Sequence, residues 1–517
     1  MAVLDHERCY RAVLSRDARF DGWFVGAVRT TGVYCRPSCP AVTPKSGNIT
    51  FYPTAATAQQ NGYRACKRCR PDASPGSPEW NIRGDVVGRA MRLVADGVVD
   101  REGVAGLARR LAYSERHLTR LLTEELGAGP LAIARAQRVE TARTLIETTD
   151  LDFTTIAHAA GFGSVRQFND TVRDVYAATP TALRANADSR RGPRAATGAV
   201  ELELAVREPF DASALFGFLA TRSIPGIEHW DGTAYHRTLG LPHGHGVAEA
   251  WPASRRNGRT RPVVRVRVRL EDWRDLAPAV RRLRHLLDLD ADPVAVDAVL
   301  GEDPRFGGVV ATSPGRRSPA AVDPFEIVVR AVVGQQISVA GARTVVGRIV
   351  ASAGEPLRVD GGPGALTHVF PTPVAMAGID PALLPMPASR RRTLVELAAR
   401  IVDGRIVLGS GADRDELAAA LSEVPGVGPW TTGYVLMRGL GDPDVFLPTD
   451  LGAKEGLARL GVAVPHTERW RPWRSYALHH LWGLPKMKAE HVTGAKSRFG
   501  TAGAPAPSPA ASKKETS

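Results

Sequence analysis

Apolar residues change their spacing along the chain, and each change predicts a different kind of structure. From residue 86 the apolar positions follow helical spacing, as Leu107, Leu111, Leu118 and Leu122 illustrate. The segment PVVRVRVRL at 262–270 instead alternates with period two, as a strand with one buried face does. Beyond residue 286 the mainly apolar faces are again helical. The pattern predicts a helical region, then a small sheet layer, then a second helical region.

Two stretches interrupt this pattern. The stretch at 187–199 is small, polar and broken by Pro and Gly, which is typical of a flexible linker. The tail at 497–517, with APAPSPAASKKETS, is low in complexity and is expected to be disordered. The chain of 517 residues is too long for one core and suggests about three or four domains.

A helical hairpin is predicted within the last helical region. A short helix ends at Glu423, the turn Pro425-Gly426-Val427-Gly428 follows, and a second helix begins near Pro429. Both glycines permit positive φ and leave the backbone bare. Gly426 and Gly428 can therefore present amide N–H groups at a helix N-terminus to a DNA phosphate. The alternative is an ordinary turn.

Two aromatic residues and a carboxylate follow this turn. Trp430 and Tyr434 lie at positions i and i+4, on one face of the second helix. A Gly/Pro-rich loop then leads to Asp450. Each has a structural alternative, because the aromatic pair could belong to the core and Asp450 could cap the helix that begins at Leu451. The order and spacing of the three favour a site.

Composition and charge narrow the class of partner. The hydrophobic content of 44% is that of a globular protein, while a formal charge of +13 favours a polyanion, nucleic acid before membrane. The start MAVLDHERCY carries charges where a signal peptide is apolar, and no stretch of about 18 apolar residues occurs. We expect a cytoplasmic, nucleoid-associated protein without a membrane partner.

All five cysteines lie near the N-terminus. Cys35 and Cys39 form a C-x3-C pair, and Cys66 and Cys69 form a C-x2-C pair. Two such pairs in a short cytosolic domain predict one tetrahedral zinc ion, which could be purely structural. Cys9 falls outside the pattern and is expected to be a small buried residue. The absence of later cysteines argues against an iron–sulfur cluster.

The segment FVGAVRTTGVYCRPSCPAVTPKSGNITFYPTAATAQQNGYRACKRCRPD resembles the N-terminal domain of the Ada methylation-response proteins. In that family a zinc-bound thiolate accepts a methyl group from a DNA methylphosphotriester. The resemblance implies that Cys35 is the acceptor and that Cys39, Cys66 and Cys69 are the other ligands. The chemistry is consistent, since zinc keeps a thiol ionised at neutral pH and the thiolate is the nucleophile.

Two helix-turn-helix units are expected between residues 80 and 186. GLARRLAYSERHLTRLLTEELG forms the first, and TTIAHAAGFGSVRQFNDTVRDVYAATPTALR forms the second, with Phe168 as a core anchor. The second segment resembles the AraC-type regulators, which place one recognition helix from each unit in successive major grooves. These helices are expected at about 114–123 and 164–175. Candidate base or phosphate contacts, each of which could equally be a plain exposed residue, are Arg116, His117, Arg120, Arg166, Gln167 and Asn169.

The hairpin, the aromatic pair and Asp450 resemble the helix-hairpin-helix DNA glycosylases of the bacterial alkylation-inducible 3-methyladenine type. FDASALFGFLATRSIPGIEHW and ERWRPWRSYALHHLW match that family too. The resemblance implies that Trp430, Tyr434 and Trp482 line the base pocket and that Gln336 is the wedge that enters the duplex gap. The inducible enzyme has leucine at the wedge, and it has tyrosine where this chain has Leu451.

The resemblance also implies a mechanism. An N-alkylated purine carries positive charge and leaves without protonation, so one carboxylate, Asp450, suffices to stabilise the oxocarbenium-like sugar and orient water. Aromatic faces attract the flipped cationic base. Trp430 stands where bifunctional relatives have a nucleophilic lysine, so a monofunctional enzyme without a Schiff base is expected.

The expected fold is multidomain α+β. It combines a small zinc domain, an all-α double helix-turn-helix domain, a small α/β sheet layer and an all-α helix-hairpin-helix glycosylase body. The domain boundaries we predict are 1–78 for the zinc methyl-acceptor domain, 80–186 for the regulator domain, 187–199 for the linker, 200–285 for the sheet layer, 286–496 for the glycosylase body and 497–517 for the tail.

The function expected from these parts is a response to DNA alkylation damage. A suicidal methylphosphotriester-DNA:cysteine methyltransferase would switch on an AraC-type activator, fused to a DNA-3-methyladenine glycosylase for base excision repair. Expected partners are damaged and promoter double-stranded DNA and RNA polymerase. One alternative is a regulator with a catalytically inactive, DNA-gripping C-terminal half. Another is a glycosylase for oxidised purines, which the missing lysine and the cation-suited pocket disfavour.

Overall fold

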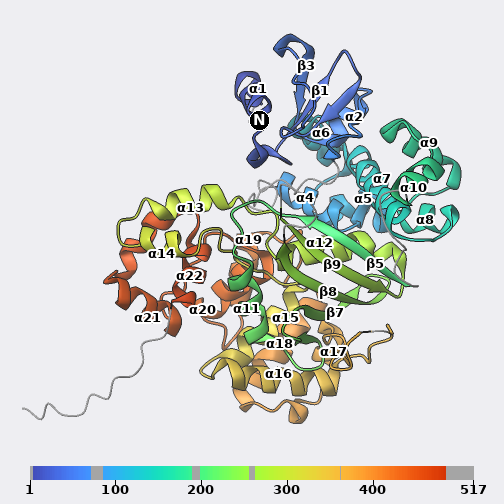
Figure 1. The fold of residues 1–517 in the computed structure, drawn as a ribbon. Helices are drawn as coiled ribbons and strands as arrows, with labels where there is room; N and C mark the ends of the chain where they lie inside the picture. The colour runs from blue at the N-terminus through green and yellow to red at the C-terminus, as the bar shows by residue number, and fades with distance from the viewer. Residues whose placement is uncertain (1–3, 72–85, 189–197, 255–261, 361, 485–517) are drawn as a thin grey trace, which may run out of the picture. The chain divides into compact units, whose positions relative to one another are not determined.

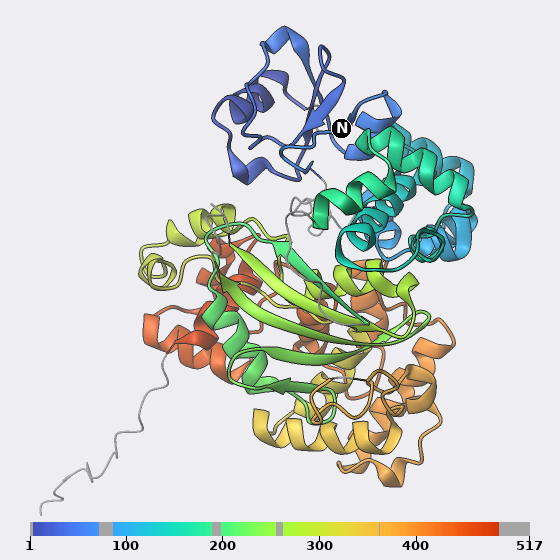
Figure 2. The same ribbon diagram turned by 45° about the vertical axis from the view of Figure 1, so that its right-hand side comes forward.

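The computed structural model describes residues 4–71, 86–188, 198–254, 262–360 and 362–484. The expected tail lies wholly outside these residues, and so does most of the expected linker. The chain divides into two compact units, residues 1–483 and residues 484–517, and all but one residue of the second lies outside the described ranges. The description below therefore concerns the first unit, whose ribbon is drawn in Figures 1 and 2.

The N-terminal domain is built on a small four-stranded sheet. Its strand order is β3-β1-β2-β4, where β1 pairs antiparallel with β2 and β3, and β2 pairs parallel with β4. Cys9 is buried against Phe24 and Ile49, as expected for a small core residue. The elements are α1 (His6–Leu14), β1 (Val25–Val28), β2 (Val33–Cys35), β3 (Ile49–Tyr52), α2 (Ala55–Gln60) and β4 (Arg64–Ala65).

Within residues 86–188 the next domain consists of seven helices, as the apolar spacing predicts. Two of them, α6 and α9, begin one residue after Ser114 and Ser164, whose hydroxyls accept backbone N–H groups as N-caps. Phe168 on α9 is fully buried in the core. The helices are α4 (Val86–Ala95), α5 (Val98–Arg110), α6 (Glu115–Leu126), α7 (Pro130–Thr148), α8 (Phe153–Ala159), α9 (Val165–Tyr176) and α10 (Pro180–Asp188).

A five-stranded antiparallel sheet follows, in the order β5-β9-β8-β7-β6. The alternation in β9 is the predicted one, with every second residue buried. On its other face Arg267 pairs with Glu201 at 2.6 Å, so this face is neutralised by neighbouring strands. The elements are β5 (Ala199–Ala205), α11 (Ala212–Arg222), β6 (Glu228–Trp230), β7 (Tyr235–Leu241), β8 (Gly244–Ser254), β9 (Val263–Leu270) and α12 (Leu276–Leu286).

The last region is helical, as Figure 1 shows in yellow to red. It packs around a core of mainly aliphatic side chains. A buried ionic network joins it to the sheet, where Arg237 contacts Glu326 at 2.9 Å and Arg330 contacts Glu228 at 2.6 Å. The helices are α13 (Pro293–Gly301), α14 (Gly307–Thr312), α15 (Pro324–Gly334), α16 (Val339–Ala353), α17 (Pro373–Ala377), α18 (Ala388–Val402), α19 (Arg414–Ser422), α20 (Pro429–Val435), α21 (Leu451–Leu460) and α22 (Arg474–Gly483).

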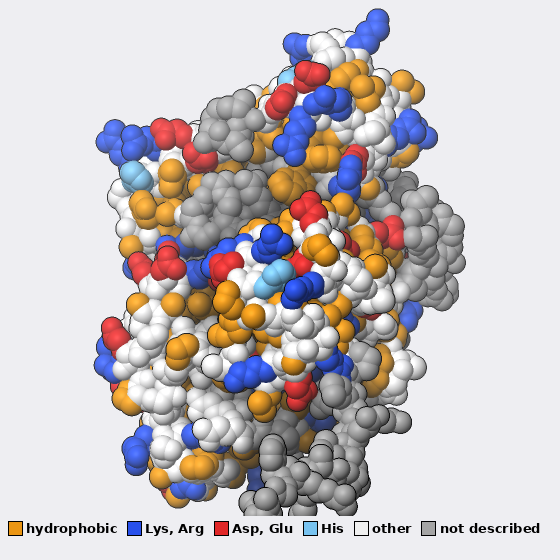
Figure 3. Space-filling view, turned by 90° about the vertical axis from the view of Figure 1, so that its left-hand side faces the viewer, with side chains coloured by type: hydrophobic (Ala, Val, Ile, Leu, Met, Phe, Trp, Pro, Cys, Tyr) orange, Lys and Arg blue, Asp and Glu red, His pale blue; other side chains and the backbone are white. Residues whose placement is uncertain are grey.

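Charged side chains of both signs are scattered over the surface shown in Figure 3, where basic residues alternate with acidic ones. The excess of basic residues in the sequence therefore does not form one continuous positively charged patch on this face.

Within the described ranges, no helix is both long and apolar enough to cross a bilayer.

Candidate active sites and DNA-binding surfaces

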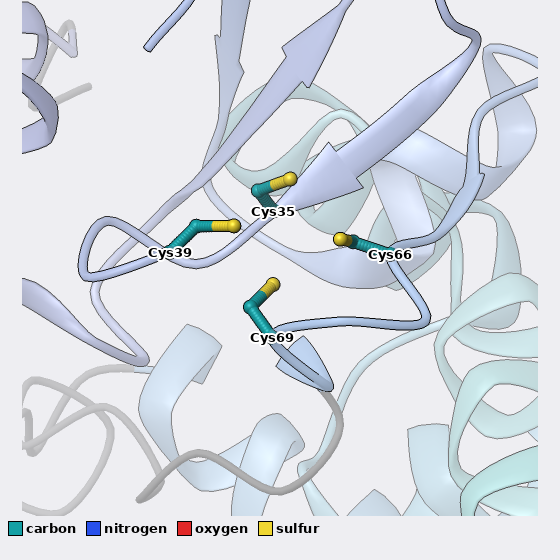
Figure 4. Close-up of side chains that lie close together, drawn as sticks. All are labelled: Cys35, Cys39, Cys66 and Cys69. Atoms are coloured by element: carbon teal, nitrogen blue, oxygen red, sulfur yellow. The ribbon is translucent and has the colours of Figure 1, made fainter. Parts of the chain in front are cut away.

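Four cysteine side chains of the N-terminal domain meet at one point. The Sγ atoms of Cys35, Cys39, Cys66 and Cys69 all lie within 4.8 Å of one another. Figure 4 shows the four sulfurs directed toward a common centre, from the end of β2, from two loops and from the residue after β4. The predicted pairing of the C-x3-C and C-x2-C motifs is thus realised in space, with the donor set and grouping of a tetrahedral zinc site.

The electrostatics of the cluster require a cation. Hydrogen bonds with Cys39 and Cys69, followed by burial, raise the pKa of the Cys35 thiol well above its usual range. Hydrogen bonds from Cys35 and Cys69 instead lower the pKa of Cys39. Ionisation of the Cys35 thiol at neutral pH therefore requires a positive charge bound beside it. The residues present fit a zinc ion.

A buried carboxylate holds the segment between Cys35 and Cys39. Asp21 is 0% exposed and accepts hydrogen bonds from the Ser38 backbone N–H at 3.0 Å and the Ser38 hydroxyl at 2.6 Å. The Nε of Arg36 lies 3.6 Å from the same carboxylate. Sequence reasoning missed Asp21, because nothing local distinguishes it from a turn residue. It fixes the loop that carries the expected methyl acceptor.

The predicted hairpin is present, but its two glycines serve different purposes. Gly426 has φ +89°, and a Cβ there would lie 2.4 Å from the Thr393 hydroxyl. Gly428 has φ −103° and ψ 179°, which any residue adopts, so only Gly426 uses the positive φ that both glycines permit. A Cβ at Gly428 would meet nothing within 4 Å, which leaves the backbone open to an incoming group.

Asp450 is held by both indoles predicted to line the pocket. Its Oδ2 accepts from Trp430 Nε1 at 3.2 Å, and its Oδ1 accepts from Trp482 Nε1 at 2.8 Å. Oδ1 also accepts the Ala453 N–H at 3.0 Å, so Asp450 caps α21 as well. The two interpretations of Asp450 are therefore compatible, since the cap fixes the carboxylate that the indoles orient.

The rings near Asp450 form two stacked pairs. Trp430 stacks on Tyr434 with centroids 5.1 Å apart and an interplanar angle of 15°. Trp482 stacks on Phe218 of α11 at 6.1 Å and 13°. Leu451 is 76% exposed and adds no wall to these pairs. Phe218 was not identified from the sequence, because it comes from the sheet layer and meets α22 only through tertiary packing.

Basic side chains accompany Phe218. The Arg222 guanidinium carbon lies 3.9 Å from the centre of the Phe218 ring and 5.9 Å from that of Trp482, and burial lowers the Arg222 pKa to about 10. The Arg438 guanidinium lies 4.7 Å from Phe218. Burial, then the Arg438 and Arg222 charges, lower the pKa of His479 well below its usual range, so this imidazole is neutral at pH 7. Sequence reasoning identified none of these three.

The expected wedge occupies a tight turn between α15 and α16. Gln336 is exposed and has φ +60°, which is unusual for a residue with a Cβ. The Oε1 of Gln336 lies 3.5 Å from the Arg390 guanidinium. Gln336 is thus an exposed residue of the turn that joins α15 to α16.

The expected DNA contacts of the regulator domain lie on α6 and α9. Arg116, His117 and Arg120 are exposed on α6, and the Arg166 side chain on α9 is 94% exposed. Asn169 is half-buried. Gln167 has a competing local role, because its Oε1 accepts the Gly163 N–H at 3.3 Å next to the Ser164 cap.

Comparison with known proteins bears on all three regions. The metal binding domain of Ada matches residues 8–72, a helix-turn-helix domain matches residues 107–186, and the AlkA N-terminal domain matches residues 201–323. The chain is 54% identical over 485 residues to the probable bifunctional transcriptional activator/DNA repair enzyme AlkA of Mycobacterium tuberculosis, covering 92% of this chain and 96% of that protein. The chain belongs to this family.

Two relatives resemble the halves of this Ada–AlkA fusion. The DNA-3-methyladenine glycosylase 2 of Escherichia coli is 35% identical over 279 residues, covering 53% of this chain and 94% of that enzyme. The bifunctional transcriptional activator/DNA repair enzyme Ada of Escherichia coli is 35% identical over 156 residues, covering 30% of this chain and 43% of that protein. The expected fusion of an Ada-type regulator with an AlkA-type glycosylase is confirmed.

Proposed function

We propose that this protein repairs alkylated DNA and regulates transcription in response to the same damage. Its C-terminal half would excise N-alkylated purines of the 3-methyladenine and 7-methylguanine class, leaving an intact abasic site. The observation that carries this proposal is the Asp450 carboxylate, fixed by the indole N–H groups of Trp430 and Trp482 beside two stacked aromatic pairs.

The geometry supports a hydrolysis that needs one carboxylate. Positive charge develops on the deoxyribose ring as the bond to the cationic base breaks, and Asp450 would stabilise it and orient the attacking water. Two N–H donors keep the carboxylate in one orientation before the substrate arrives, so little reorganisation is required. Trp430, Tyr434 and Trp482 would stack on the flipped base. Gln336 would fill the gap that the base leaves.

The hairpin would hold the DNA backbone near the lesion. Among the described residues, no backbone carbonyl accepts the N–H of Gly426 or Gly428. These groups remain available to a phosphate, at the start of α20 where the helix dipole favours an anion. The protein would thus grip the duplex through backbone amides, which carry no sequence preference.

The N-terminal domain would accept one methyl group from a DNA methylphosphotriester. A zinc ion held by Cys35, Cys39, Cys66 and Cys69 would keep the thiols ionised at neutral pH. The Cys35 sulfur would attack the methyl carbon, so that an S–CH3 bond forms and the O–CH3 bond breaks. The DNA phosphodiester leaves as an anion. Asp21 would hold the Cys35–Cys39 segment during the attack.

The regulator domain would convert this event into transcription. Helices α6 and α9 would enter successive major grooves of a promoter, with Arg116, His117 and Arg120, and then Arg166, Gln167 and Asn169, as the contacts. RNA polymerase would be the partner of the bound activator. The alternative, in which the C-terminal half only grips DNA, would leave the arrangement of Asp450 and its two indole donors without a use.

A base-release assay tests the glycosylase proposal. The purified protein is incubated with duplexes that carry one 3-methyladenine, one 7-methylguanine or one 8-oxoguanine. Free methylated base should appear together with abasic sites that break only after alkali. Absence of base release would support the DNA-gripping alternative. Strand breaks without alkali, or a covalent complex trapped by borohydride, would show that a lyase nucleophile exists.

A further inference from the structure

Gln335, the residue before the expected wedge, connects two loops that are far apart in the sequence. Its side-chain Nε2 donates hydrogen bonds to the Gly426 carbonyl at 3.0 Å and to the Thr431 hydroxyl at 3.0 Å. Gly426 is the turn glycine of the hairpin, and Thr431 lies in the first turn of α20. An amide NH2 group has two hydrogens, and this geometry uses both.

The hairpin is supported from its other side by α18. The Thr393 hydroxyl donates to the Pro425 carbonyl at 2.8 Å. Because a trans peptide directs its N–H opposite to its C=O, this bond turns the Gly426 N–H away from Thr393. The Pro425 and Gly426 carbonyls are thus both bound by side chains. The hairpin backbone that would face a phosphate is fixed by Thr393 and Gln335 together.

The wedge turn has few other constraints. Helix α15 ends at Gly334, and α16 begins at Val339, where the Ser338 hydroxyl caps it by accepting the Gly341 N–H. Residues 336–340 are all exposed. Gln336 lies in the left-handed region at the tip, a conformation that its surroundings must maintain. Gln335 is the half-buried residue that ties this tip to packed structure, because Thr431 is 3% exposed.

We propose that Gln335 is a positioning residue that couples the wedge to the hairpin. When the hairpin amides hold a phosphate, the two hydrogen bonds of Gln335 place Gln336 at a fixed distance from that phosphate. Binding of the backbone thereby sets the depth at which the wedge enters the base stack. The inference rests on the proposed glycosylase function, since it assumes that Gln336 enters DNA.

The coupling predicts a selective loss of lesion recognition. Gln335→Ala removes both donors, and Gln335→Met removes them while keeping the length of the side chain. Each variant should bind a duplex with a tetrahydrofuran abasic site about tenfold more weakly than the parent. Binding to the undamaged duplex should stay within about twofold, because it does not require the wedge and Thr393 still holds the Pro425 carbonyl of the hairpin. Thr431→Val removes one of the two acceptors and should cause a smaller loss of affinity for the abasic duplex. The double variant Gln335→Ala/Thr431→Val should bind no more weakly than Gln335→Ala.

Fluorescence anisotropy with the full-length protein measures the ratio of its affinities for the abasic and the undamaged duplex. The fluorescence of a 2-aminopurine placed opposite the tetrahydrofuran site reports insertion of the wedge. Thr344→Val is the matched control, because that exposed hydroxyl bonds, within the part of the chain that the structure describes, only to the Ala340 carbonyl of α16. If Gln335 has a purely structural role, its variants should have a lower melting temperature and should bind both duplexes more weakly by the same factor. That result would overturn the coupling. An unchanged ratio in Gln335→Ala and Gln335→Met would also overturn it.

The parent protein separates this inference from the function on which it rests. If the parent shows no preference for the abasic duplex, the wedge and the glycosylase proposal fail, and the coupling fails with them. If the parent shows the preference and the Gln335 variants retain it, only the coupling fails. A preference that is present in the parent and in Thr344→Val, but lost in both Gln335 variants, supports it.

Discussion

The indole N–H of Trp482 donates a hydrogen bond to Oδ1 of Asp450 at 2.8 Å. The same oxygen accepts the Ala453 N–H, while the other carboxylate oxygen accepts Trp430 Nε1 at 3.2 Å. A carboxylate that accepts three hydrogen bonds is restrained in position. Its negative charge can still stabilise a positive charge that develops in front of it. The geometry that caps α21 would therefore also serve the proposed stabilisation of a cationic sugar.

The first prediction concerns the charge of Asp450. Asp450→Asn keeps an oxygen that can cap α21, since Asn is as good an N-cap as Asp, but removes the negative charge. Excision of 3-methyladenine should fall by at least about a hundredfold, because such electrostatic stabilisation is worth several kcal/mol. Affinity for an abasic duplex should change little. Asp380→Asn, which alters the cap of a distant 3-10 turn, is the control. Near-normal base release by Asp450→Asn would refute the assignment.

A second prediction separates the hydrogen bonds of the indoles from their stacking. Trp482→Phe and Trp430→Phe each keep an aromatic ring and remove one donor to Asp450. The turnover number should fall about tenfold in Trp482→Phe, since hydrogen bonds to charged groups contribute about 1.5–3 kcal/mol. The loss should be smaller in Trp430→Phe, whose bond is longer. Single-turnover excision kinetics measure both, and a reversed order would show that stacking dominates.

Local sequence signals predicted much of this architecture. The recognition helices were expected to begin near Ser114 and Ser164, and both serines are N-caps in the structure, because capping depends on residues within one turn. The alternation in β9 likewise follows from the period of a strand. The four cysteines were grouped correctly because metal-ligand spacing is itself a local pattern.

The remaining features depend on packing between distant segments. Phe218 and Arg222 reach Trp482 only because α11 of the sheet layer packs near the helical body. Asp21 and Gln335 act through hydrogen bonds to loops that the chain forms elsewhere, so their neighbours in sequence do not reveal them. At Gly428 the residue type allowed a positive φ that the turn does not use.

The third prediction concerns Asp21 in the zinc domain. Asp21→Asn keeps one acceptor for the Ser38 backbone but loses the charge that attracts Arg36. The protein should still bind one zinc ion per chain, because no cysteine changes. The rate of methyl uptake from phosphotriester DNA should fall about tenfold, as the Cys35–Cys39 segment loses its support. Glu7→Gln, an exposed change on α1, should leave both unchanged. Loss of zinc in Asp21→Asn would assign Asp21 a structural role instead.

A fourth prediction concerns pH and Asp288, which is buried beside the Ser318 N–H. Burial raises the Asp288 pKa from 3.8 to about 6. A raised pKa means that the protonated form suits the fold, so this contribution to stability is complete below about pH 4 and is lost as pH rises through about 6. Asp288→Asn mimics the protonated form and tolerates the positive φ of this position.

The variant should therefore melt at the same temperature as the parent near pH 4 and at a higher temperature at pH 7. At pH 7 the free energy of unfolding of the variant should exceed that of the parent by up to about 3 kcal/mol, because the pKa shift is about two units and each unit corresponds to about 1.4 kcal/mol. Calorimetry of the glycosylase transition at several pH values measures it. A variant that is less stable than the parent at pH 7 would show that the ionised Asp288 is compensated by Arg317, which faces it.

The last prediction is the switch between damage and transcription. Four thiolates around one divalent zinc ion give the site a net charge of about −2, which repels nearby phosphates. A methyl on Cys35 turns one thiolate into a neutral thioether, so the net charge of the site changes from about −2 to about −1. Removing one repulsion at close approach is worth on the order of 1 kcal/mol, so promoter affinity should rise roughly tenfold. The gain should shrink as salt screens the charges.

Methylation with phosphotriester DNA, mass spectrometry of Cys35 and promoter binding against salt provide the test. Unchanged affinity, or methyl uptake by Cys35→Ala, would leave the cysteines as a zinc knuckle only.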